Sequence, residues 1–285
     1  MTNAPHLVVL GIAQDGGHPQ AGCWRPCCAP AWEDRRLGHL PACLGLIDPS
    51  TGGRWLLDAT PAISEQIARL GPPQSGKQAI DGVVVTHAHL GHVLGVLHLG
   101  REALGADSLP VYGLPRLRRM LSENLPWSLL AEHGHCTWEA LEDEPTLGPF
   151  AVRSIRVPHR GEASETAAVF AKGPNKTALY LPDIDRWHGW TTDVAELVAQ
   201  VDFAFLDATF FDDREIGWRD PATIPHPRVR DTMDRLQHLP DAERAKVRFL
   251  HFNHTNPMLD RNSAETQEVL ARGYGIAREG DVIEL

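Results

Sequence analysis

The sequence predicts a single α/β domain whose two halves are both rich in strands. Apolar runs of strand length recur in both halves, with segments of helical spacing between them. No Ser/Gly-rich linker and no internal repeat separates the halves. The length of 285 residues and the hydrophobic content of 42% are typical of globular proteins, and one mixed α/β core can extend over roughly 200 to 300 residues. We therefore expect one domain over residues 1–285.

The first half is expected to begin with a buried strand and a long loop rich in Gly, Pro and Cys, from Gln14 to about Pro41. A Pro-Ser-Thr-Gly-Gly turn at 49–53 predicts a hairpin between the two runs that flank it. The expected strands of this half are 6–13, 43–48, 54–59 and 82–89, with a helix at 61–70.

The second half repeats this strand-rich pattern. Its expected strands lie near 150–157, 165–172, 176–182, 202–207 and 247–252, with a helix near 191–200. The segment 208–227 is aromatic, acidic and rich in Pro but lacks periodicity, which predicts an ordered loop near a functional site.

The charge balance argues against a polyanionic partner. The chain has 27 Lys and Arg against 37 Asp and Glu, a formal charge of −10, whereas nucleic-acid binding depends on basic residues. Residues 1–11 do not show the basic segment followed by a long apolar run that is typical of a secretion signal. No apolar run reaches the ~20 residues of a membrane span. No glycine-rich phosphate-binding motif follows a strand. We expect a soluble, cytoplasmic protein that binds neither nucleic acid nor membrane.

The clearest chemical feature is a group of three histidines directly after the apolar run 83–85. His87 and His89 leave the end of an extended chain on the same side, and the following turn can bring His92 back toward them. Neutral imidazole is the commonest zinc ligand in proteins and also suits iron. The sequence therefore predicts a metal centre at the end of this strand.

The segment from Thr86 to His92 resembles the H-x-H-x-D-H motif of the metallo-β-lactamase superfamily. That resemblance implies a four-layer αβ/βα sandwich, with two central mixed sheets flanked by helices and metals at the sheet edges. The chain departs from the motif at Gly91, where the family has Asp. Loss of that ligand favours one active-site metal over two, and both one and two metals remain open.

The resemblance also implies the other ligands, each after a predicted strand. His159 follows 150–157, Asp183 follows 176–182, and His251 lies in the last run. By analogy, a first site contains His87, His89 and His159, Asp183 is shared, and a second site contains His92 and His251. Two histidines and a carboxylate also suit non-haem Fe(II), so both zinc and iron remain open.

Two carboxylates have alternative assignments. Asp185 lies two residues after Asp183, and either could cap the following segment, but Asp183 ends the strand directly. Asp207 either holds a turn or orients a ligand imidazole, as outer carboxylates of metal sites do.

Cys23, Cys27 and Cys28 lie close together on the first long loop. Three thiolates suit a structural zinc that needs a fourth ligand, and His254 is our first choice because it follows His251 by three residues. Other candidates for the fourth ligand are His18, His39 and Cys43, and free or buried thiols are the alternative to a metal site. Cys136 stands alone and is expected to be structural.

Four segments resemble the pyrroloquinoline quinone biosynthesis protein B branch of the superfamily more than the lactamases. They are residues 10–20, 86–95, 206–213 and 254–257. This resemblance implies a structural zinc loop and a role in that quinone pathway or in a related metallo-hydrolase. A phosphodiesterase branch is similar in combining a cysteine zinc loop with a His-x-x-His ending.

The expected activity is hydrolysis of an ester, amide or phosphodiester in a small-molecule or peptide-like substrate by a metal-activated water. Asp183 would orient this water, and a histidine that is not a ligand, with His254 as the candidate, would protonate the leaving group. Substrate contacts are expected from 15–20, 208–227 and 253–258, namely from Asp15, His18, Phe211 and Asn253.

Two other functions compete with hydrolysis. The same ligands around Fe(II) could serve an oxygenase of the quinone pathway, and metal content with oxygen uptake separates the two. A binding protein that has lost its second metal through Gly91 would show little turnover. A homodimer is an open option for the assembly.

Overall fold

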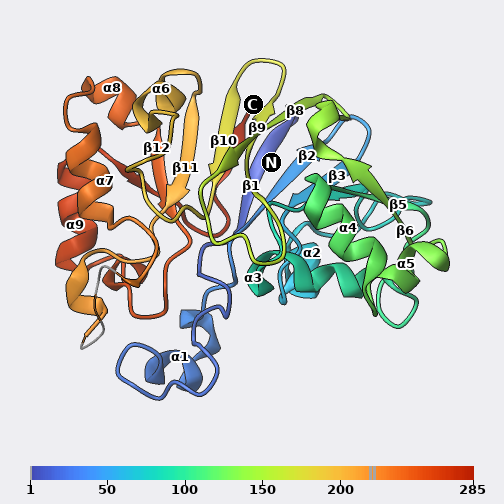
Figure 1. The fold of residues 1–285 in the computed structure, drawn as a ribbon, viewed down its shortest axis with the longest axis horizontal. Helices are drawn as coiled ribbons and strands as arrows, with labels where there is room; N and C mark the ends of the chain where they lie inside the picture. Colours follow the sequence, from blue (N-terminus) through green and yellow to red (C-terminus); the bar gives the residue numbers. More distant parts are fainter. Residues whose placement is uncertain (1, 218–219, 221–222) are drawn as a thin grey trace.

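The computed structural model describes residues 2–217, 220 and 223–285. Two seven-stranded sheets pack face to face, and helices cover the outer face of each (Figure 1). This arrangement is the predicted four-layer αβ/βα sandwich. The first sheet and its helices come mainly from the first half of the chain, and the second sheet from the second half.

The first sheet has the strand order β14-β1-β2-β3-β4-β5-β6. Its strands are β1 (His6–Gly11), β2 (Cys43–Asp48), β3 (Gly53–Leu57), β4 (Gly82–Val84), β5 (Leu109–Gly113), β6 (Cys136–Ala140) and β14 (Val282–Glu284). The second sheet has the order β13-β12-β11-β10-β9-β8-β7. Its strands are β7 (Thr146–Leu147), β8 (Phe150–Val157), β9 (Thr166–Lys172), β10 (Thr177–Leu181), β11 (Phe203–Asp207), β12 (Val247–Leu250) and β13 (Gly275–Ile276).

The helices are short and lie mostly outside the sheets (Figure 1). The α-helices are α1 (Ala29–Glu33), α2 (Ile63–Arg69), α3 (Leu90–Val93), α4 (Pro115–Glu123), α5 (Ser128–Glu132), α6 (Val194–Ala199), α7 (Val229–Leu236), α8 (Asp241–Arg244) and α9 (Ala264–Ala271). Single 3-10 turns occur at Arg35–Leu37, Leu94–Leu99, Leu141–Asp143, Asp213–Glu215 and Pro257–Leu259.

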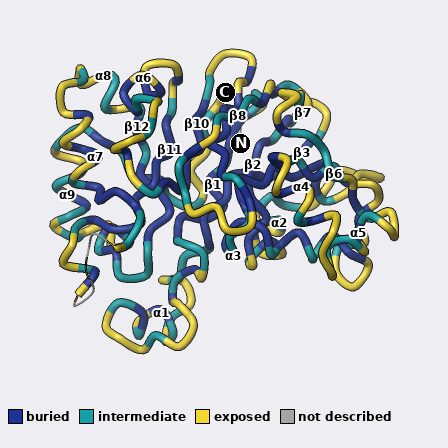
Figure 2. The backbone as a smooth tube through the Cα atoms, in the orientation of Figure 1, coloured by how far each residue is buried: buried dark blue, intermediate teal, exposed yellow. Residues whose placement is uncertain are grey.

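The core follows from the alternation of side chains along each strand. In β2, Leu44 and Leu46 point into the layer between the sheets, whereas Cys43 points to the layer under the helices. β2, β3, β9, β10 and β11 are buried on both faces over most of their length, which explains why they read as nearly continuous apolar runs. Figure 2 shows the buried backbone concentrated in the two sheets.

The predicted strands of the second half lie within one residue or a few of the observed ones, and β2 matches its prediction at both ends. Three boundaries are corrected. The strand predicted at 82–89 ends at Val84, because the chain leaves the sheet there to carry the histidines; the strand predicted at 6–13 ends at Gly11, and the helix at 61–70 is confined to Ile63–Arg69. The sequence predicts none of β5, β6, β7, β13 and β14, and among the α-helices it predicts only α2 and α6.

Strand direction brings the loops of both sheets to one edge. β10, β11 and β12 run parallel, and β8 runs the same way because both β8 and β10 pair antiparallel with β9. In the first sheet β4 is parallel to β3 and β5. The segments that follow β4, β8, β10, β11 and β12 therefore share one edge of the sandwich, where the predicted ligands lie.

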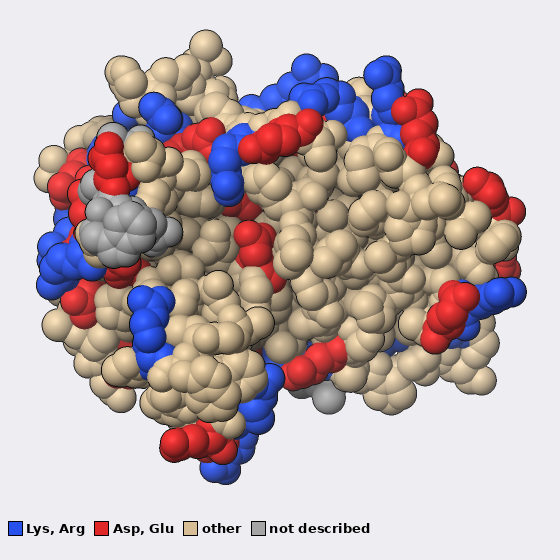
Figure 3. All heavy atoms as spheres, turned by 60° about the horizontal axis from the view of Figure 1, so that its bottom comes forward, with Lys and Arg blue, Asp and Glu red and all other residues tan. Residues whose placement is uncertain are grey.

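The cysteine-containing segment with α1 projects below this edge (Figure 1) and is mostly exposed or half-buried (Figure 2). Basic and acidic side chains are interspersed over the face seen in Figure 3. Among the described residues, no helix is both long and apolar enough to cross a membrane.

Candidate metal centre

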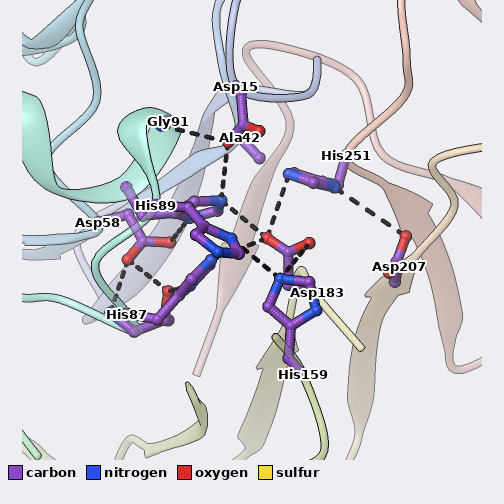
Figure 4. A network of polar contacts seen from close by, with 12 residues as sticks. Asp15, Ala42, Asp58, His87, His89, Gly91, His159, Asp183, Asp207 and His251 are labelled. Carbon is purple, nitrogen blue, oxygen red and sulfur yellow. Dashed lines mark hydrogen bonds and ion pairs between the residues drawn. The ribbon is translucent and has the colours of Figure 1, made fainter. Parts of the chain in front are cut away.

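Three histidines from two sheets form the first half of the centre. His87 and His89 follow β4, and His159 follows β8. The Nε2 atom of His159 lies 3.0 Å from Nδ1 of His89, and one nitrogen of each of the three rings lies within 4.8 Å of the others. Figure 4 shows the three rings converging. Because zinc–nitrogen distances are about 2.0–2.1 Å, such nitrogens can share one ion.

Asp183, directly after β10, lies at the middle of the site (Figure 4). Its Oδ2 atom is 2.9 Å from Nε2 of His92, 3.4 Å from Nε2 of His251 and 3.5 Å from Nε2 of His87. Its Oδ1 atom lies 3.6 Å from Nε2 of His159. This carboxylate therefore contacts histidines of both predicted sites. Asp185 instead lies outside the centre, with Oδ1 2.9 Å from Nδ1 of His159.

The second half of the centre contains His92, in α3, and His251, after β12. A third side chain, Asp15 from the loop after β1, faces the same place with Oδ1 3.6 Å from Nε2 of His92. Ligand atoms of these three residues lie within 4.8 Å of one another. Asp15 was expected from the sequence to contact substrate, and its side chain instead lies beside two of the predicted metal ligands.

In His87, His92 and His251, the ring nitrogen that faces away from the centre contacts a polar neighbour. Nδ1 of His92 lies 2.6 Å from Asp58 Oδ2, Nδ1 of His87 lies 3.0 Å from the Thr86 hydroxyl, and Nδ1 of His251 lies 3.0 Å from the Thr209 hydroxyl. Such contacts fix the tautomer and orientation of a metal ligand. They leave Nε2 of all three rings aimed inward.

The inward-facing atoms fit a bound cation. Nε2 of His87 and Nε2 of His251 are buried and make no hydrogen bond to any described residue, and Nε2 of His92 has only the 2.9 Å contact with Oδ2 of Asp183. Burying polar atoms that lack hydrogen bonds is costly, and an ion that accepts their lone pairs removes that cost. The donor set of imidazoles and carboxylates suits zinc and also iron.

Burial and neighbouring charges shift the pKa values of these groups. Burial and the nearby His92 hold the pKa of His87 well below its usual range, so His87 is neutral and able to donate a lone pair. Burial opposes ionisation of Asp183, but His251 and His92 outweigh it and hold the pKa of that carboxyl well below its usual value. For His92, Asp58 overcomes the effect of burial and raises the pKa.

Backbone strain is concentrated at the site. Asp58, His226 and His251 adopt left-handed φ angles of 73°, 80° and 67°, which non-glycine residues rarely adopt. Each such residue costs of order 1–3 kcal/mol and persists only where the surrounding structure enforces it. The contacts of these three side chains inside the centre provide that enforcement.

Two residues of the centre were not predicted. Asp58 follows β3 and is fully buried, and it also accepts hydrogen bonds from Thr86 N and from the hydroxyl of Tyr180. Its position at a strand end was a usable signal. His226 lies within 208–227, with Nδ1 2.7 Å from Asp207 Oδ2 and 3.5 Å from Asp183 Oδ1. No periodicity marked it, and only the tertiary fold reveals it.

Asp207 belongs to this network. It holds His226, accepts hydrogen bonds from the backbone N–H and hydroxyl of Thr209, and lies 4.0 Å from Nδ1 of His251. The side chain therefore orients imidazoles and also closes its own turn. The two roles weighed from sequence are combined in one residue.

The cysteine site is separate from the histidine centre. Sγ of Cys27 lies 3.8 Å from Sγ of Cys23 and 3.9 Å from Sγ of Cys28, and Nδ1 of His254 lies 3.2 Å from Sγ of Cys28. Tetrahedral zinc with bonds of about 2.3 Å places its thiolates about 3.8 Å apart. These four side chains therefore fit one structural zinc, although Cys27 and Cys28 are adjacent.

The other candidates for a fourth zinc ligand lie elsewhere. Cys43 is fully buried in the core under the helices, and Nε2 of His18 contacts the carbonyl of Cys27 at 2.7 Å. The ring of His18 stacks on His39. His18 thus supports the loop from outside the sulfur cluster.

A pocket of about 590 Å³ lies beside the centre, lined by Arg25, Arg160, Phe210, His226, Asn253 and His254 among others. Asn253, expected to bind substrate, faces this pocket. Phe211 does not, because its side chain is completely buried in the core, which contradicts its predicted substrate contact, and Phe210 lines the pocket instead. Parts of the segment 208–227, residues 218–219 and 221–222, lie outside the described residues.

Comparisons with known proteins agree with this architecture. A family model described as the β-lactamase superfamily domain matches residues 46–252. Coenzyme PQQ synthesis protein B of Methylorubrum extorquens is 27% identical over 310 residues, covering 98% of this chain and 100% of the relative. The protein of the same name from Xanthomonas campestris pv. campestris is 24% identical over 304 residues, covering 98% and 99%.

Solved structures show the same fold. The Zn²⁺-bound PqqB of Methylobacterium extorquens superposes with a TM-score of 0.82 at 24% identity, covering 98% of this chain and 100% of the other. A diphosphatase from the PhnP family superposes with a TM-score of 0.70 at 22% identity, covering 99% and 97%. The chain therefore belongs to the β-lactamase superfamily, and within it resembles coenzyme PQQ synthesis protein B over nearly its whole length.

Proposed function

We propose that this protein is a metal-dependent hydrolase that cleaves a small anionic phosphodiester. The observation that carries the proposal is the convergence of buried histidine nitrogens on the carboxylate of Asp183. His87, His89, His159 and Asp183 would hold one metal ion. A bound zinc or iron ion supplies Lewis acidity and lowers the pKa of a coordinated water toward about 7.

The pocket favours a negatively charged substrate. Arg25 and Arg160 line it, beside the polar side chains of Gln20 and Asn253. Arginine pairs with phosphate through two parallel hydrogen bonds, which makes it well suited to a phosphodiester. Glu215 also lines the pocket, and burial raises its pKa to about 7, so near neutral pH it adds less than a full negative charge.

The chain's own residues divide the remaining tasks. Asp183 lies among the histidines and can orient a water by accepting its hydrogen bond. His226 faces the pocket, and its Nδ1 is engaged by Asp207, which leaves Nε2 to give a proton to the leaving oxygen. Burial lowers the pKa of His226, but Asp207 outweighs it and raises the value, which favours the protonated form.

This assignment differs from the expectation that His254 is the proton donor. His254 also lines the pocket, but its Nδ1 lies among the cysteine thiols. A ring that ligates a structural zinc has limited freedom to approach a leaving group. We therefore place proton donation at His226 and the structural role at His254.

The test is a substrate screen with purified full-length protein loaded with zinc or iron. Bis(p-nitrophenyl) phosphate, p-nitrophenyl acetate and an anilide are compared for the wild type and His89→Ala. We expect phosphodiester turnover that the variant loses. Turnover of the ester or anilide alone would contradict the phosphodiester, and no turnover with any metal would favour a binding protein.

A second candidate is a non-haem iron oxygenase. His92, His251 and Asp183 provide two histidines and a carboxylate with open positions, and the relatives are named for coenzyme PQQ synthesis. Oxygen uptake with phenolic or amino-acid-like compounds distinguishes this function. Iron dependence together with oxygen consumption would replace the hydrolase proposal.

A further inference from the structure

Gly91 and Asp15 lie against each other at the second half of the centre. The backbone N–H of Gly91 donates a hydrogen bond of 3.2 Å to Oδ1 of Asp15, as Figure 4 shows. Asp15 approaches from the loop after β1, far from Gly91 in sequence. The two positions therefore meet only through the tertiary fold.

This contact requires glycine at position 91. A Cβ atom there would lie less than 3.0 Å from both Oδ1 and Cα of Asp15, a separation that Cβ atoms in real structures essentially never show. Gly91 is not among the residues with positive φ, so its backbone does not call for glycine. Glycine also weakens the helix α3 in which it lies. The close approach of the Asp15 loop is therefore the remaining reason for a glycine at position 91.

The loop that carries Asp15 is held next to the metal ligands. Ala13 forms β-bridges with Pro41 and with Phe252, and Gln14 N donates to the carbonyl of Phe252 at 2.8 Å. Phe252 directly follows the ligand His251. The position of the Asp15 backbone is thus tied to the same chain segment that positions His251.

The second half of the centre can take a further ligand. His92, His251 and the shared Asp183 supply three donors, and zinc in proteins takes four or more, including water at catalytic sites. Oδ1 of Asp15 is 3.6 Å from Nε2 of His92, and a nitrogen of His251 completes a group within 4.8 Å. A carboxylate at this position can reach the same ion as both histidines.

We propose that Asp15 replaces the carboxylate missing at position 91, so that this chain binds two active-site metal ions. The ligand is moved from α3 to the loop after β1, and Gly91 provides the space that the move requires. The proposal rests on the metal centre of the proposed function but not on its reaction. It predicts two active-site metals, whereas the motif alone left one or two open.

The first test counts metal ions by mass spectrometry after stripping and reloading the full chain with zinc. The wild type is expected to bind three ions, one at the cysteines and two at the histidine centre. Asp15→Asn is expected to bind two, because asparagine can still accept the Gly91 hydrogen bond but lacks the charge. The matched control Asp213→Asn removes a carboxylate that is 62% exposed and pairs with Arg228, and it should keep three.

A second variant reaches the same site without touching Asp15. Gly91→Ala displaces the loop through its Cβ atom and is expected to lose the same ion. Loading with Mn²⁺ adds a spectroscopic readout, because two ions about 3.5–4 Å apart couple magnetically and a single ion does not. We expect coupling in the wild type and in Asp213→Asn, and its loss in Asp15→Asn.

Failure of this proposal is separable from failure of the metal centre. If His89→Ala loses an ion and Asp15→Asn keeps all of them, Asp15 is not a ligand and the proposal is overturned. The same holds if the wild type carries one ion at the histidines without magnetic coupling. If neither variant changes the metal content, the histidine centre itself is wrong.

Discussion

The histidine centre and the cysteine site use similar ligands but are built in different ways. The histidine centre collects side chains mainly from strand ends of both sheets, and most of them are buried while the others are half-buried. The cysteine site takes three ligands from six consecutive positions of a projecting loop and only His254 from elsewhere. The histidine centre therefore depends on the whole fold, whereas the cysteine site depends on one segment and on His254.

This difference predicts how each site responds to damage. The histidine centre is held by buried hydrogen bonds through Asp58, Thr86 and Tyr180, so a change there reaches the core. The loop around the cysteines is tied by local contacts such as the 2.7 Å hydrogen bond from Trp32 Nε1 to the Cys23 carbonyl. Damage to the loop should stay local, as in other independently opening units.

The largest expected effect is that of Asp58→Ala on folding. The variant removes a fully buried carboxylate, leaves Thr86 N–H and Nδ1 of His92 without that partner, and leaves the Tyr180 hydroxyl with only the Ala42 carbonyl. Breaking such a network by deleting one member costs about 3–5 kcal/mol. Denaturant unfolding of the metal-free protein measures this cost. A loss below about 1 kcal/mol would show that the centre is not coupled to the core.

The next largest effect is expected on catalysis, and it tests whether His226 of the histidine centre or His254 of the cysteine site donates the catalytic proton. His226→Gln is expected to lower kcat about 100-fold or more with little change in KM, while His254→Gln, with zinc content monitored, lowers it far less. A proton donor must be protonated, and Asp207 raises the pKa of His226 above 6.5, so wild-type kcat falls as pH rises through that raised pKa. The pH profile of His226→Gln should lack this fall. The reverse order of the two variants would assign the proton to the cysteine site.

The smallest global effect is expected from Cys28→Ser. It should remove one zinc, leave the metals of the histidine centre in place, and change the free energy of global unfolding by less than about 1 kcal/mol. Limited proteolysis should instead become faster within residues 18–37, because the loop loses its tether to His254. If loss of the cysteine-site zinc in this variant prevents the two sheets from folding, the distinction between the two sites is refuted.

Much of the candidate site could be predicted because its ligands follow strands. His87 belongs to the histidine motif, the superfamily resemblance implies His159, Asp183 and His251, and all four come after an apolar run, so that parallel strand ends bring them to one edge. Asp58 follows the same rule but carries no motif. His226 and Phe211 could not be assigned, because within 208–227 the sequence has no period to show which side chains turn inward.

The sequence by itself determined the strand-rich α/β class, the histidine motif and the cysteine cluster, because these depend on local periodicity and short spacing. Only the tertiary structure decided what Gly91 means. Along the chain it is a lost ligand, but in space it is the gap into which Asp15 fits. The physical reason is that steric exclusion and coordination act between atoms that are close in space, whatever their separation along the chain.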